Sequence, residues 1–402
     1  MISTVQQDTL WTKSFIIMCL SNFMMCFSFY LLMPTLPFYL MDVFHTSKGM
    51  IGVVLSSYTV AVLAIRPFSG FLADTFSRKP MYLIAYFLFV SIFIGYLLAG
   101  VLTIFIAFRT LHGLAFGAVS TTGNTLVIDV MPASRRGEGL GYYGAMNNLS
   151  MAFGPMVGLF LKDTLGFDAI FYVAIIFGSV GMFLAFFIQA PLKLPQEHQA
   201  ISLDRFILLK GIPAGISLVL ITIPYGMTNT YIALYAEKLG LISHTGMFFF
   251  IMSVGLILSR ISSGKKVDHG QMTNIIKQGY FIVMIGLLGE IFLHSVSNYN
   301  SILGYVLLFV IAFFLGYGYG TLIPALNMLF VNLAPHNRRA TANSTYLTSW
   351  DIGIGSGILF GGFISEWISF TFMYAVGLIL SLLALLLFHT SVVSHFQKNK
   401  LR

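Results

Sequence analysis

The chain has 402 residues, of which 57% are hydrophobic and only 9% are charged, and its formal net charge at pH 7 is +8. Soluble domains carry about 25% charged residues, so this composition excludes a soluble globular protein. Its apolar runs reach the length of about 20 residues that spans a bilayer as a helix, which favours helices over a β-barrel. The positive charge does not indicate a nucleic-acid partner, because the basic residues fall on alternate loops.

The apolar runs predict twelve membrane-spanning helices. No cleavable signal peptide is expected before the first of them. Pro34 and Pro37 predict a bend in that first helix. Cys19 and Cys26 lie seven residues apart in it, cannot bond to each other in a straight helix, and are interpreted as packing residues. In chain order the predicted spans are 14–40, 50–72, 81–99, 102–128, 139–161, 167–189, 207–234, 245–263, 275–296, 302–330, 342–363 and 368–389.

The basic residues predict the orientation of these helices. With the N-terminus in the cytosol, only Lys48, Lys162 and Lys238 fall on the outer side, and Arg109 lies inside a helix. All other lysines and arginines lie on or near the inner side, as the positive-inside rule requires. We therefore predict an integral protein of a bacterial inner (cytoplasmic) membrane, monomeric in the lipid bilayer, with both termini in the cytoplasm.

The polar stretch Ala190–Asp204 divides the chain near its middle. We predict an N-terminal bundle over residues 1–189, a linker over 190–206 and a C-terminal bundle over 207–402. An internal repeat supports this division, because a set that runs from Gly113 to Asn148 recurs from Gly316 to Asp351 at one offset. A second set recurs at another constant offset and pairs Arg66, Gly70 and Asp74 with Arg260, Gly264 and Asp268. Parallel repeats of this kind are typical of one large class of secondary transporters, with the substrate site near the midplane.

Three motifs carry a resemblance to the major facilitator superfamily. The stretch GFLADTFSRKP from Gly70 to Pro80 resembles the pattern that links helices two and three in that superfamily. Arg109, Gly113 and Gly117 resemble its helix-four motif. Gly154, Pro155 and Gly158 resemble the helix-five motif of its antiporters. The resemblance implies an all-α membrane protein with 12 transmembrane helices in two pseudo-symmetric six-helix bundles, similar to the drug and proton antiporter branch.

Charged residues at the inner helix ends form a predicted conformational latch, which closes the inner face when the cavity opens outward. The alternative is a topogenic anchor that only fixes the orientation of the chain. The residues of this latch are Arg66, Gly70, Asp74, Arg78, Lys79, Asp129, Arg260, Gly264 and Asp268.

Ionisable side chains inside a membrane are costly and mark candidate functional sites. Asp351 lies about ten residues into helix eleven, near the midplane, where desolvation disfavours the charged carboxylate. Its repeat counterpart, Asn148, does not titrate. Arg109 needs a partner at its depth, which we expect to be Asp351, an amide such as Asn148, backbone carbonyls or an anionic part of the substrate. Asp351 and Arg109 are predicted to serve proton coupling, with a purely structural lock as the alternative.

Two further ionisable residues belong to the predicted proton-coupling set. His112 shares a helix face with Arg109, and its alternative interpretation is a core histidine. Glu290 lies toward the outer end of helix nine, where His294 one turn later predicts a local pair. That pair favours a structural interpretation of Glu290 as the alternative to proton transfer.

In the resembled fold, helices one, four, seven and ten, with parts of five and eleven, line the substrate cavity. Their amides and phenols suit an amphipathic or hydroxylated organic solute, although most rings in such a chain pack against lipid or other helices. No acid occurs between Phe15 and Tyr39, which argues against a cationic drug. The candidate cavity residues are Asn22, Tyr30, Asn147, Asn148, Tyr225, Asn229, Tyr231, Tyr317, Tyr319, Asn327 and Trp350.

No phosphate-binding glycine loop, metal cluster or catalytic triad occurs in the sequence, so we expect no enzyme, no cofactor and no metal. The predicted function is a proton-coupled secondary transporter that exports a small amphipathic organic compound or drug by alternating access. A proton-coupled uptake symporter for a sugar or small metabolite is the first alternative, and a non-transporting membrane receptor with the same fold is the second.

Overall fold

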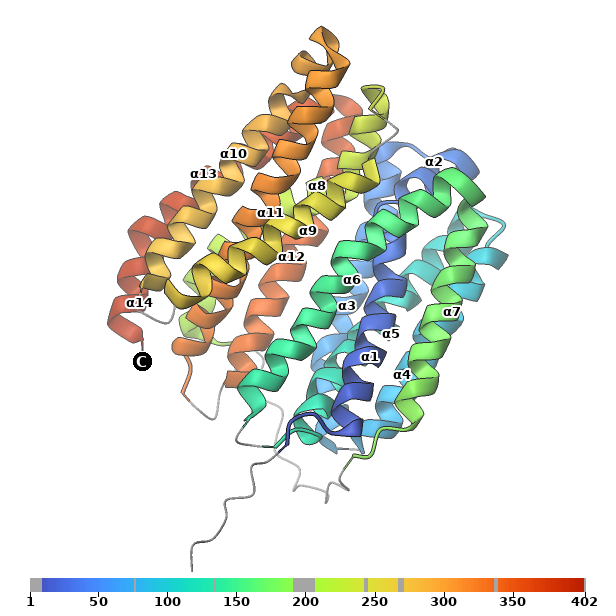
Figure 1. The fold of residues 1–402 in the computed structure, drawn as a ribbon, viewed down its shortest axis with the longest axis vertical. Coiled ribbons are helices and arrows are strands. Elements are labelled where there is room, and N and C mark those ends of the chain that lie inside the picture. Colours follow the sequence, from blue (N-terminus) through green and yellow to red (C-terminus); the bar gives the residue numbers. More distant parts are fainter. Residues whose placement is uncertain are drawn as a thin grey trace, which may run out of the picture. The chain divides into compact units, whose positions relative to one another are not determined.

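The structure, a computed structural model, describes residues 9–75, 77–132, 135–190, 207–241, 245–266, 271–335 and 339–400. Residues 67, 70–75, 137, 261–266 and 339–340 are described by their backbone alone. The described chain contains helices and no strand, as predicted for the fold class. The helices are α1 (Lys13–Leu32), α2 (Leu36–Phe44), α3 (Lys48–Thr75), α4 (Arg78–Leu98), α5 (Leu102–Asp129), α6 (Arg136–Leu165), α7 (Phe167–Phe186), α8 (Ile212–Lys238), α9 (Thr245–Lys266), α10 (Met272–Tyr299), α11 (Ser301–Asn332), α12 (Arg339–Trp367), α13 (Phe370–Leu387) and α14 (Val393–Asn399) (Figure 1).

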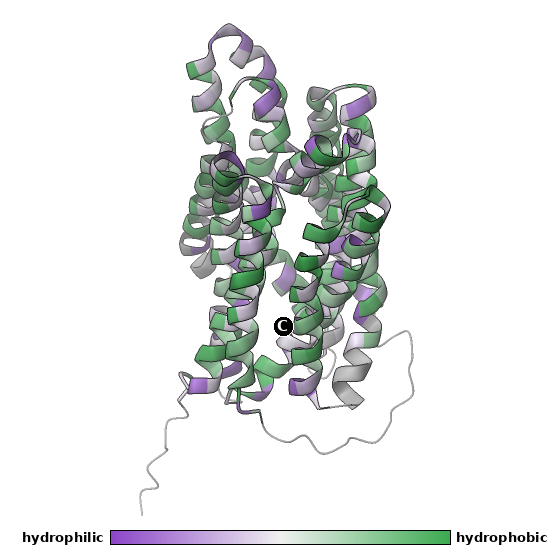
Figure 2. Cartoon of the chain, turned by 90° about the vertical axis from the view of Figure 1, so that its right-hand side faces the viewer, coloured by the Kyte–Doolittle hydropathy of each residue, from purple (hydrophilic) through white to green (hydrophobic). Residues whose placement is uncertain are grey.

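Each predicted span overlaps at least one of these helices. Within the described residues, 10 helices are long and apolar enough to cross a membrane by length and composition. The helices α6 and α9 fall outside that set. The part of α9 whose side chains the structure describes, Thr245–Arg260, is apolar but shorter than 18 residues. Figure 2 shows that hydrophobic residues dominate along the helices. The prediction of an all-α membrane protein is confirmed.

The first predicted span, 14–40, is divided into α1 and α2 by a turn at Met33–Thr35. Pro34 causes this break, because proline has no amide hydrogen for the helix and disfavours helical backbone at the residue before it. Pro37 falls in the first turn of α2, where its missing donor leaves no bond unmade. The bend expected from these two prolines is therefore a complete interruption.

Two compact units divide the chain, as far as their described residues go. One unit holds Met1–Leu32, Val60–Gly154 and Leu161–Gln199, and the other holds Met33–Thr59, Pro155–Phe160 and Ala200–Arg402. Two segments of the predicted N-terminal half, Met33–Thr59 and Pro155–Phe160, belong to the second unit. The first segment joins it because the start of α3 packs on the end of α12, where the Gly49 amide donates to Glu366 Oε2 at 2.5 Å.

In the first unit, α1 packs against α7, and α4 packs against α5 and α7. Buried hydroxyls tie α4 to α1, since Tyr82 and Ser21 share a hydrogen bond of 3.0 Å and Tyr86 donates to the Ser21 carbonyl at 3.1 Å. The helix α6 approaches α1 closely at Gly154, where a Cβ atom would lie 2.6 Å from that of Tyr30. This close approach gives the glycine of the predicted helix-five motif a packing role.

In the second unit, α11 packs against α9 and α10, while α8 packs against α12 and α13. The contact between α8 and α12 brings backbones together, because a Cβ atom at Gly226 would lie 2.5 Å from the carbonyl oxygen of Ile354. One turn further, Tyr231 donates from its hydroxyl to the Ile358 carbonyl at 2.7 Å. Small residues and a buried phenol therefore fix these two helices against each other.

Candidate functional site

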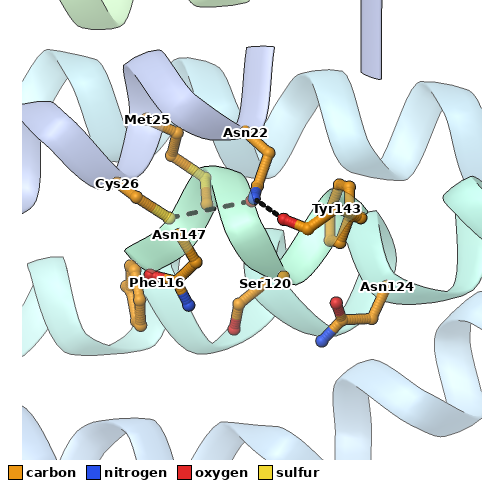
Figure 3. A pocket seen from close by; sticks show the side chains of 9 residues that line it. Asn22, Met25, Cys26, Phe116, Ser120, Asn124, Tyr143 and Asn147 are labelled. Atoms are coloured by element: carbon orange, nitrogen blue, oxygen red, sulfur yellow. Dashed lines mark hydrogen bonds between the residues drawn. The ribbon is translucent and has the colours of Figure 1, made fainter. Parts of the chain in front are cut away.

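The first unit contains a cavity of about 110 Å³ between α1, α5 and α6 (Figure 3). Each helix contributes residues that are one, three, four or eight positions apart, so they fall on one face of that helix. The lining residues are Asn22, Met25 and Cys26 from α1, Phe116, Ser120 and Asn124 from α5, and Tyr143, Gly144 and Asn147 from α6.

Hydrogen bonds order one wall of this cavity (Figure 3). The Asn22 amide donates from Nδ2 to the Tyr143 carbonyl at 3.3 Å, and the Cys26 thiol contacts Asn22 Oδ1 at 3.7 Å. Two other amides of the lining are available to a ligand. Asn124 and Asn147 are exposed, and their side-chain amides make no hydrogen bond within the described chain. Each of these amides offers two donors and one acceptor to a ligand.

The cavity combines polar groups with an apolar wall. Phe116 stacks on Phe29 at 4.9 Å between ring centroids, and Met25 lies beside Asn22 on α1. None of the nine lining residues is charged. Such a lining can bind an uncharged solute with both hydrogen-bonding groups and apolar surface.

Sequence reasoning predicted Asn22 and Asn147 at this site, and the structure brings them together. Two other candidates of the same unit lie outside the lining: Asn148 is half-buried on α6, and Tyr30 is half-buried on α1. Ser120 and Asn124 were missed, although they follow Phe116 at spacings of four and eight residues and so share its helix face.

The second unit gathers several of the remaining predicted cavity residues into an aromatic group. Tyr225 lies 4.8 Å from the Tyr319 ring and 5.0 Å from the Trp350 ring. Asn229 donates to the Tyr225 carbonyl at 2.9 Å. Tyr231 is completely buried and bonded to α12, so its hydroxyl is occupied in this conformation.

Two further candidates of the second unit lie on α11. Tyr317 is half-buried and its ring lies 6.1 Å from that of Phe313. Asn327 donates to Asn343 Oδ1 at 3.4 Å, which joins α11 to α12. Both side chains therefore have neighbours within their own unit.

Arg109 and His112 meet in a buried cluster of the first unit. Arg109 is 3% exposed and His112 is completely buried. The Tyr96 hydroxyl shares a hydrogen bond of 2.9 Å with His112 Nδ1 and also bonds to Arg109. The rings of Phe89 and Phe93 lie 4.6 and 4.8 Å from the imidazole. Tyr96 is a partner that the sequence did not reveal, because it comes from another helix, α4.

The two acids of the predicted proton-coupling set lie in the second unit. Asp351 is half-buried on α12 and interacts electrostatically with Tyr346, which also interacts with Arg260. Glu290 is completely buried and accepts hydrogen bonds from Thr228 on α8.

The local pair expected between Glu290 and His294 does not form among the described residues. The carboxyl of Glu290 turns inward to Thr228, whereas the His294 side chain is exposed and contacts Asn298 at 3.4 Å. The spacing of Glu290 and His294 along the helix does not determine whether the carboxyl turns toward His294 or toward another helix.

Several residues of the predicted latch have described side chains. Arg78 Nη1 lies 2.5 Å from Asp129 Oδ1 and also donates to the Thr125 carbonyl at 3.3 Å, which joins α4 to α5. Lys79 donates to the Phe186 carbonyl at the end of α7. Arg66 is half-buried in α3, and Arg260 is exposed in α9. The remaining latch residues lie outside the described side chains, namely Gly70, Asp74, Gly264 and Asp268.

The chain is similar to several bacterial proteins. Multidrug resistance protein 3 of Bacillus subtilis is 32% identical over 154 residues, which cover 38% of this chain and only 29% of that protein. The Staphylopine export protein of Staphylococcus aureus is 22% identical over 341 residues, which cover 82% of this chain and 84% of that protein. Quinolone resistance protein NorA of Staphylococcus aureus is 25% identical over 151 residues, which cover 38% of this chain and 39% of that protein.

Solved structures share the fold. A D-xylose-proton symporter matches with a TM-score of 0.76 at 14% identity, covering 95% of this chain and 98% of that one. The nucleoside transporter NupG matches with a TM-score of 0.73 at 15% identity, covering 96% of this chain and 100% of that one. At these identities the likeness concerns the fold alone.

The family model described as Major Facilitator Superfamily matches residues 18–313 and 302–400. These two ranges together span most of the chain and include both predicted halves. The motifs at Gly70–Pro80, Arg109–Gly117 and Gly154–Gly158 all fall inside the first range. The chain therefore belongs to the Major Facilitator Superfamily, and it is a membrane transporter rather than an enzyme.

Proposed function

We propose that this transporter exports a small, uncharged amphipathic organic compound in exchange for protons. The carrying observation is the cavity of the first unit, whose three asparagines, serine and aromatic rings offer hydrogen bonds and apolar contacts without a charged side chain. The names of its relatives support export, since three of them are described as multidrug resistance, staphylopine export and quinolone resistance proteins.

Asp351 is the proposed proton carrier of the exchange. It occupies helix α12 near the aromatic group of Tyr225 and Trp350, and is half-buried. The acid is neutral when protonated and needs compensation when charged. In this mechanism Arg109, or the amides near Asn148, stabilises the charged form of Asp351 in one orientation of the two halves. His112 helps to position Arg109, because both residues interact with the Tyr96 hydroxyl. Substrate then binds while the acid releases its proton.

We further propose that the protein acts as a monomer in a bacterial inner membrane, with both termini in the cytoplasm. Rocking of the two halves, residues 1–189 and 207–402, exposes the substrate alternately to either side. The latch residues stabilise the state that is closed to the cytoplasm.

The test starts from purified protein and a thermal-shift screen of uncharged, cationic and anionic amphipathic compounds. Uncharged compounds are expected to raise the unfolding temperature most, because the cavity offers no counter-ion. The best compound is then followed in inverted vesicles under an imposed pH gradient. Uptake into vesicles that are acidic inside supports export, and movement in the opposite direction supports the uptake symporter.

Asp351→Asn is expected to abolish transport driven by the pH gradient, because the amide cannot carry a proton, while protein levels stay normal. Asp163→Asn is the matched control, since Asp163 is an exposed acid paired with Lys162 at a helix end. Gradient-driven transport at the normal rate in Asp351→Asn would refute the proposed role of this acid.

A further inference from the structure

The second unit buries an acid that the proposed exchange mechanism does not use. Glu290 on α10 has 0% of its surface exposed. Its only hydrogen-bond partner within the described chain is Thr228 on α8, whose hydroxyl lies 2.9 Å from Oε1 and 3.3 Å from Oε2. Thr228 is also completely buried. A carboxyl group thus bridges two helices in a site closed to solvent.

The surroundings of Glu290 contain no charge of opposite sign. Within the described residues, no lysine, arginine or histidine forms an ion pair with it, and Thr228 is the one side chain that donates a hydrogen bond to it. A buried carboxylate requires a cation or several hydrogen bonds to offset its desolvation. The single hydroxyl of Thr228 supplies fewer donors than a buried carboxylate needs, and a bound proton would remove that requirement.

The titratable groups that face Glu290 are phenols from the helices around it. They are Tyr235 of α8, Tyr319 of α11 and Tyr374 of α13. Tyr235 is bonded to Thr371, and Tyr319 donates to the Ile221 carbonyl. Tyr374 is completely buried and its hydroxyl makes no hydrogen bond within the described chain. This hydroxyl is therefore available as a second donor when the carboxylate is charged.

The site connects directly to the aromatic group on α8. Thr228 lies between Tyr225 and Asn229, whose amide bonds to the Tyr225 carbonyl. The Tyr225 ring contacts Trp350 on α12 and Tyr319 on α11. Pro224 removes a backbone donor just before these residues, and the Tyr319 hydroxyl bonds to Ile221 beside that interruption. This part of α8 has fewer backbone bonds to resist a displacement.

We propose that Glu290 is a second proton-binding site of this transporter, and that Thr228 transmits its protonation state to α8 and the Tyr225–Trp350 contact. The proton adds to the carboxylate and leaves as the same ion, with no other bond made or broken. Because the site is closed here, exchange with solvent takes place in another conformation of the cycle. The coupling to transport rests on the proposed function, whereas proton binding and the movement of α8 do not.

Infrared spectroscopy of the purified protein tests proton binding without any substrate. The carboxylic-acid carbonyl band of Glu290 should be present at low pH, disappear at high pH and be missing from Glu290→Gln. Thr228→Val should raise the frequency of this band because the acid loses its hydrogen bond, and Thr228→Ser should restore it. Thr222→Val is the matched control, since the buried Thr222 hydroxyl bonds only within α8.

Identical pH-difference spectra for the wild type and a folded Glu290→Gln would overturn the proposal. If Glu290→Gln does not fold, Thr228→Val provides the test, because this variant keeps the acid. The proposal is then contradicted if the carboxylic-acid bands of Thr228→Val have the same frequencies as in the wild type and do not change with pH.

Trp350 fluorescence tests the transmission to α8. The other two tryptophans, Trp11 and Trp367, are replaced by phenylalanine. Asp351 follows Trp350 directly, so the measurement is made with Asp351→Asn to remove its response. A pH-dependent change in emission should remain in this background and be lost on adding Glu290→Gln or Thr228→Val. A change that survives both substitutions contradicts the link. If the band titrates but the wild type moves no solute, the proposed function fails and the proton site stands.

Discussion

Three asparagines line one small cavity, and they differ in how many hydrogen bonds they can offer to a bound solute. Asn22 is already engaged with the Tyr143 carbonyl, whereas Asn124 and Asn147 are exposed and have their amide groups free within the described residues. Binding a solute to the latter two breaks no internal hydrogen bond. They are therefore the residues in which a substitution should affect affinity rather than stability.

Asn124→Leu is expected to weaken binding of an uncharged substrate by about fivefold, because one hydrogen bond contributes roughly 1 kcal/mol. Isothermal titration or thermal shift on purified protein measures the loss. Asn298→Leu serves as control, since Asn298 is an exposed asparagine on α10 outside the cavity. Equal affinities for the two variants would show that Asn124 does not contact the substrate.

Sequence reasoning identified residues by their side-chain type and missed residues whose role depends on the packing of the helices. Asn22 and Asn147 were predicted because they are amides on helices that line the cavity in the resembled fold. Cys26 was interpreted as a packing residue, and the structure places it in the cavity lining. Tyr96 could not be predicted as the partner of Arg109, since the pair depends on how α4 packs against α5. Helix faces can be inferred from spacing, whereas contacts between helices cannot.

The contact between α8 and α12 depends on glycines, which have no side chain. A Cβ atom at Gly357 would fall on the carbonyl oxygen of Ile223, and one at Gly353 would meet Thr222 and the Val219 carbonyl. These obstacles include backbone atoms, which cannot move away by a change of rotamer. The two helices must therefore separate if either glycine gains a side chain.

Gly357→Ala is accordingly expected to destabilise the protein by about 1–3 kcal/mol, the usual cost of overpacking. Gly141→Ala is the matched control, because Gly141 lies inside α6 with nothing within 4 Å of an added Cβ atom. That variant should be neutral or stabilising by up to about 1 kcal/mol from helix propensity. Thermal unfolding in detergent compares the two, and a lower unfolding temperature for Gly141→Ala than for Gly357→Ala would contradict this interpretation.

Most helix positions could be predicted from hydropathy, since a span of apolar residues has few alternatives in a bilayer. The ends were less predictable. The last span was expected to stop at residue 389, but the chain continues through a π-helical turn, Phe388–Val392, into α14. The predicted span ends with the apolar run, and hydropathy does not reveal a helix outside the apolar segment. His395 holds it near the start of α8 through the Lys210 carbonyl.

The proposed orientation of the protein in the membrane can be tested on the single helix α8. Lys210 and Lys238 flank this helix and both are exposed. At 1.5 Å per residue the helix spans about 40 Å, enough to place the two lysines on opposite sides. The positive-inside pattern assigns Lys210 to the cytoplasm and Lys238 to the outside.

A membrane-impermeant amine reagent should label Lys238 in intact cells and Lys210 only in inverted vesicles. Mass spectrometry of the labelled peptides measures both sites in one sample. Lys398 on α14 is a further exposed lysine expected on the cytoplasmic side. Labelling of Lys210 in intact cells would reverse the proposed topology.

The predicted latch draws its residues from both halves of the chain. Asp74→Asn is expected to slow transport severalfold, because the charged group that helps close the inner face is lost. Protein insertion should be normal, as measured by the amount of protein in the membrane. Normal transport with normal insertion would favour the topogenic anchor. Asp42→Asn on α2 provides a comparison at an acid outside the predicted latch.

The division into halves could be inferred from the repeat of Arg66, Gly70 and Asp74 without any knowledge of contacts. The compact units group Met33–Thr59 and Pro155–Phe160 with the C-terminal residues. The grouping at the start of α3 depends on Lys48 and Gly49, which bond to Ser365 and Glu366 at the end of α12. An internal repeat indicates which segments share a common structure, whereas the contacts in one conformation can join segments of different repeats.

The thiol of Cys26 offers a direct way to learn what the cavity holds. The chain has two cysteines, both buried and without a disulfide, and only Cys26 lines the cavity. A buried thiol reacts slowly with reagents in bulk solution, but a weak electrophile attached to a bound compound gains a high local concentration. A Cys19→Ser chain incubated with a library of such compounds would therefore become covalently tagged by those that occupy the cavity, and their added mass would identify them.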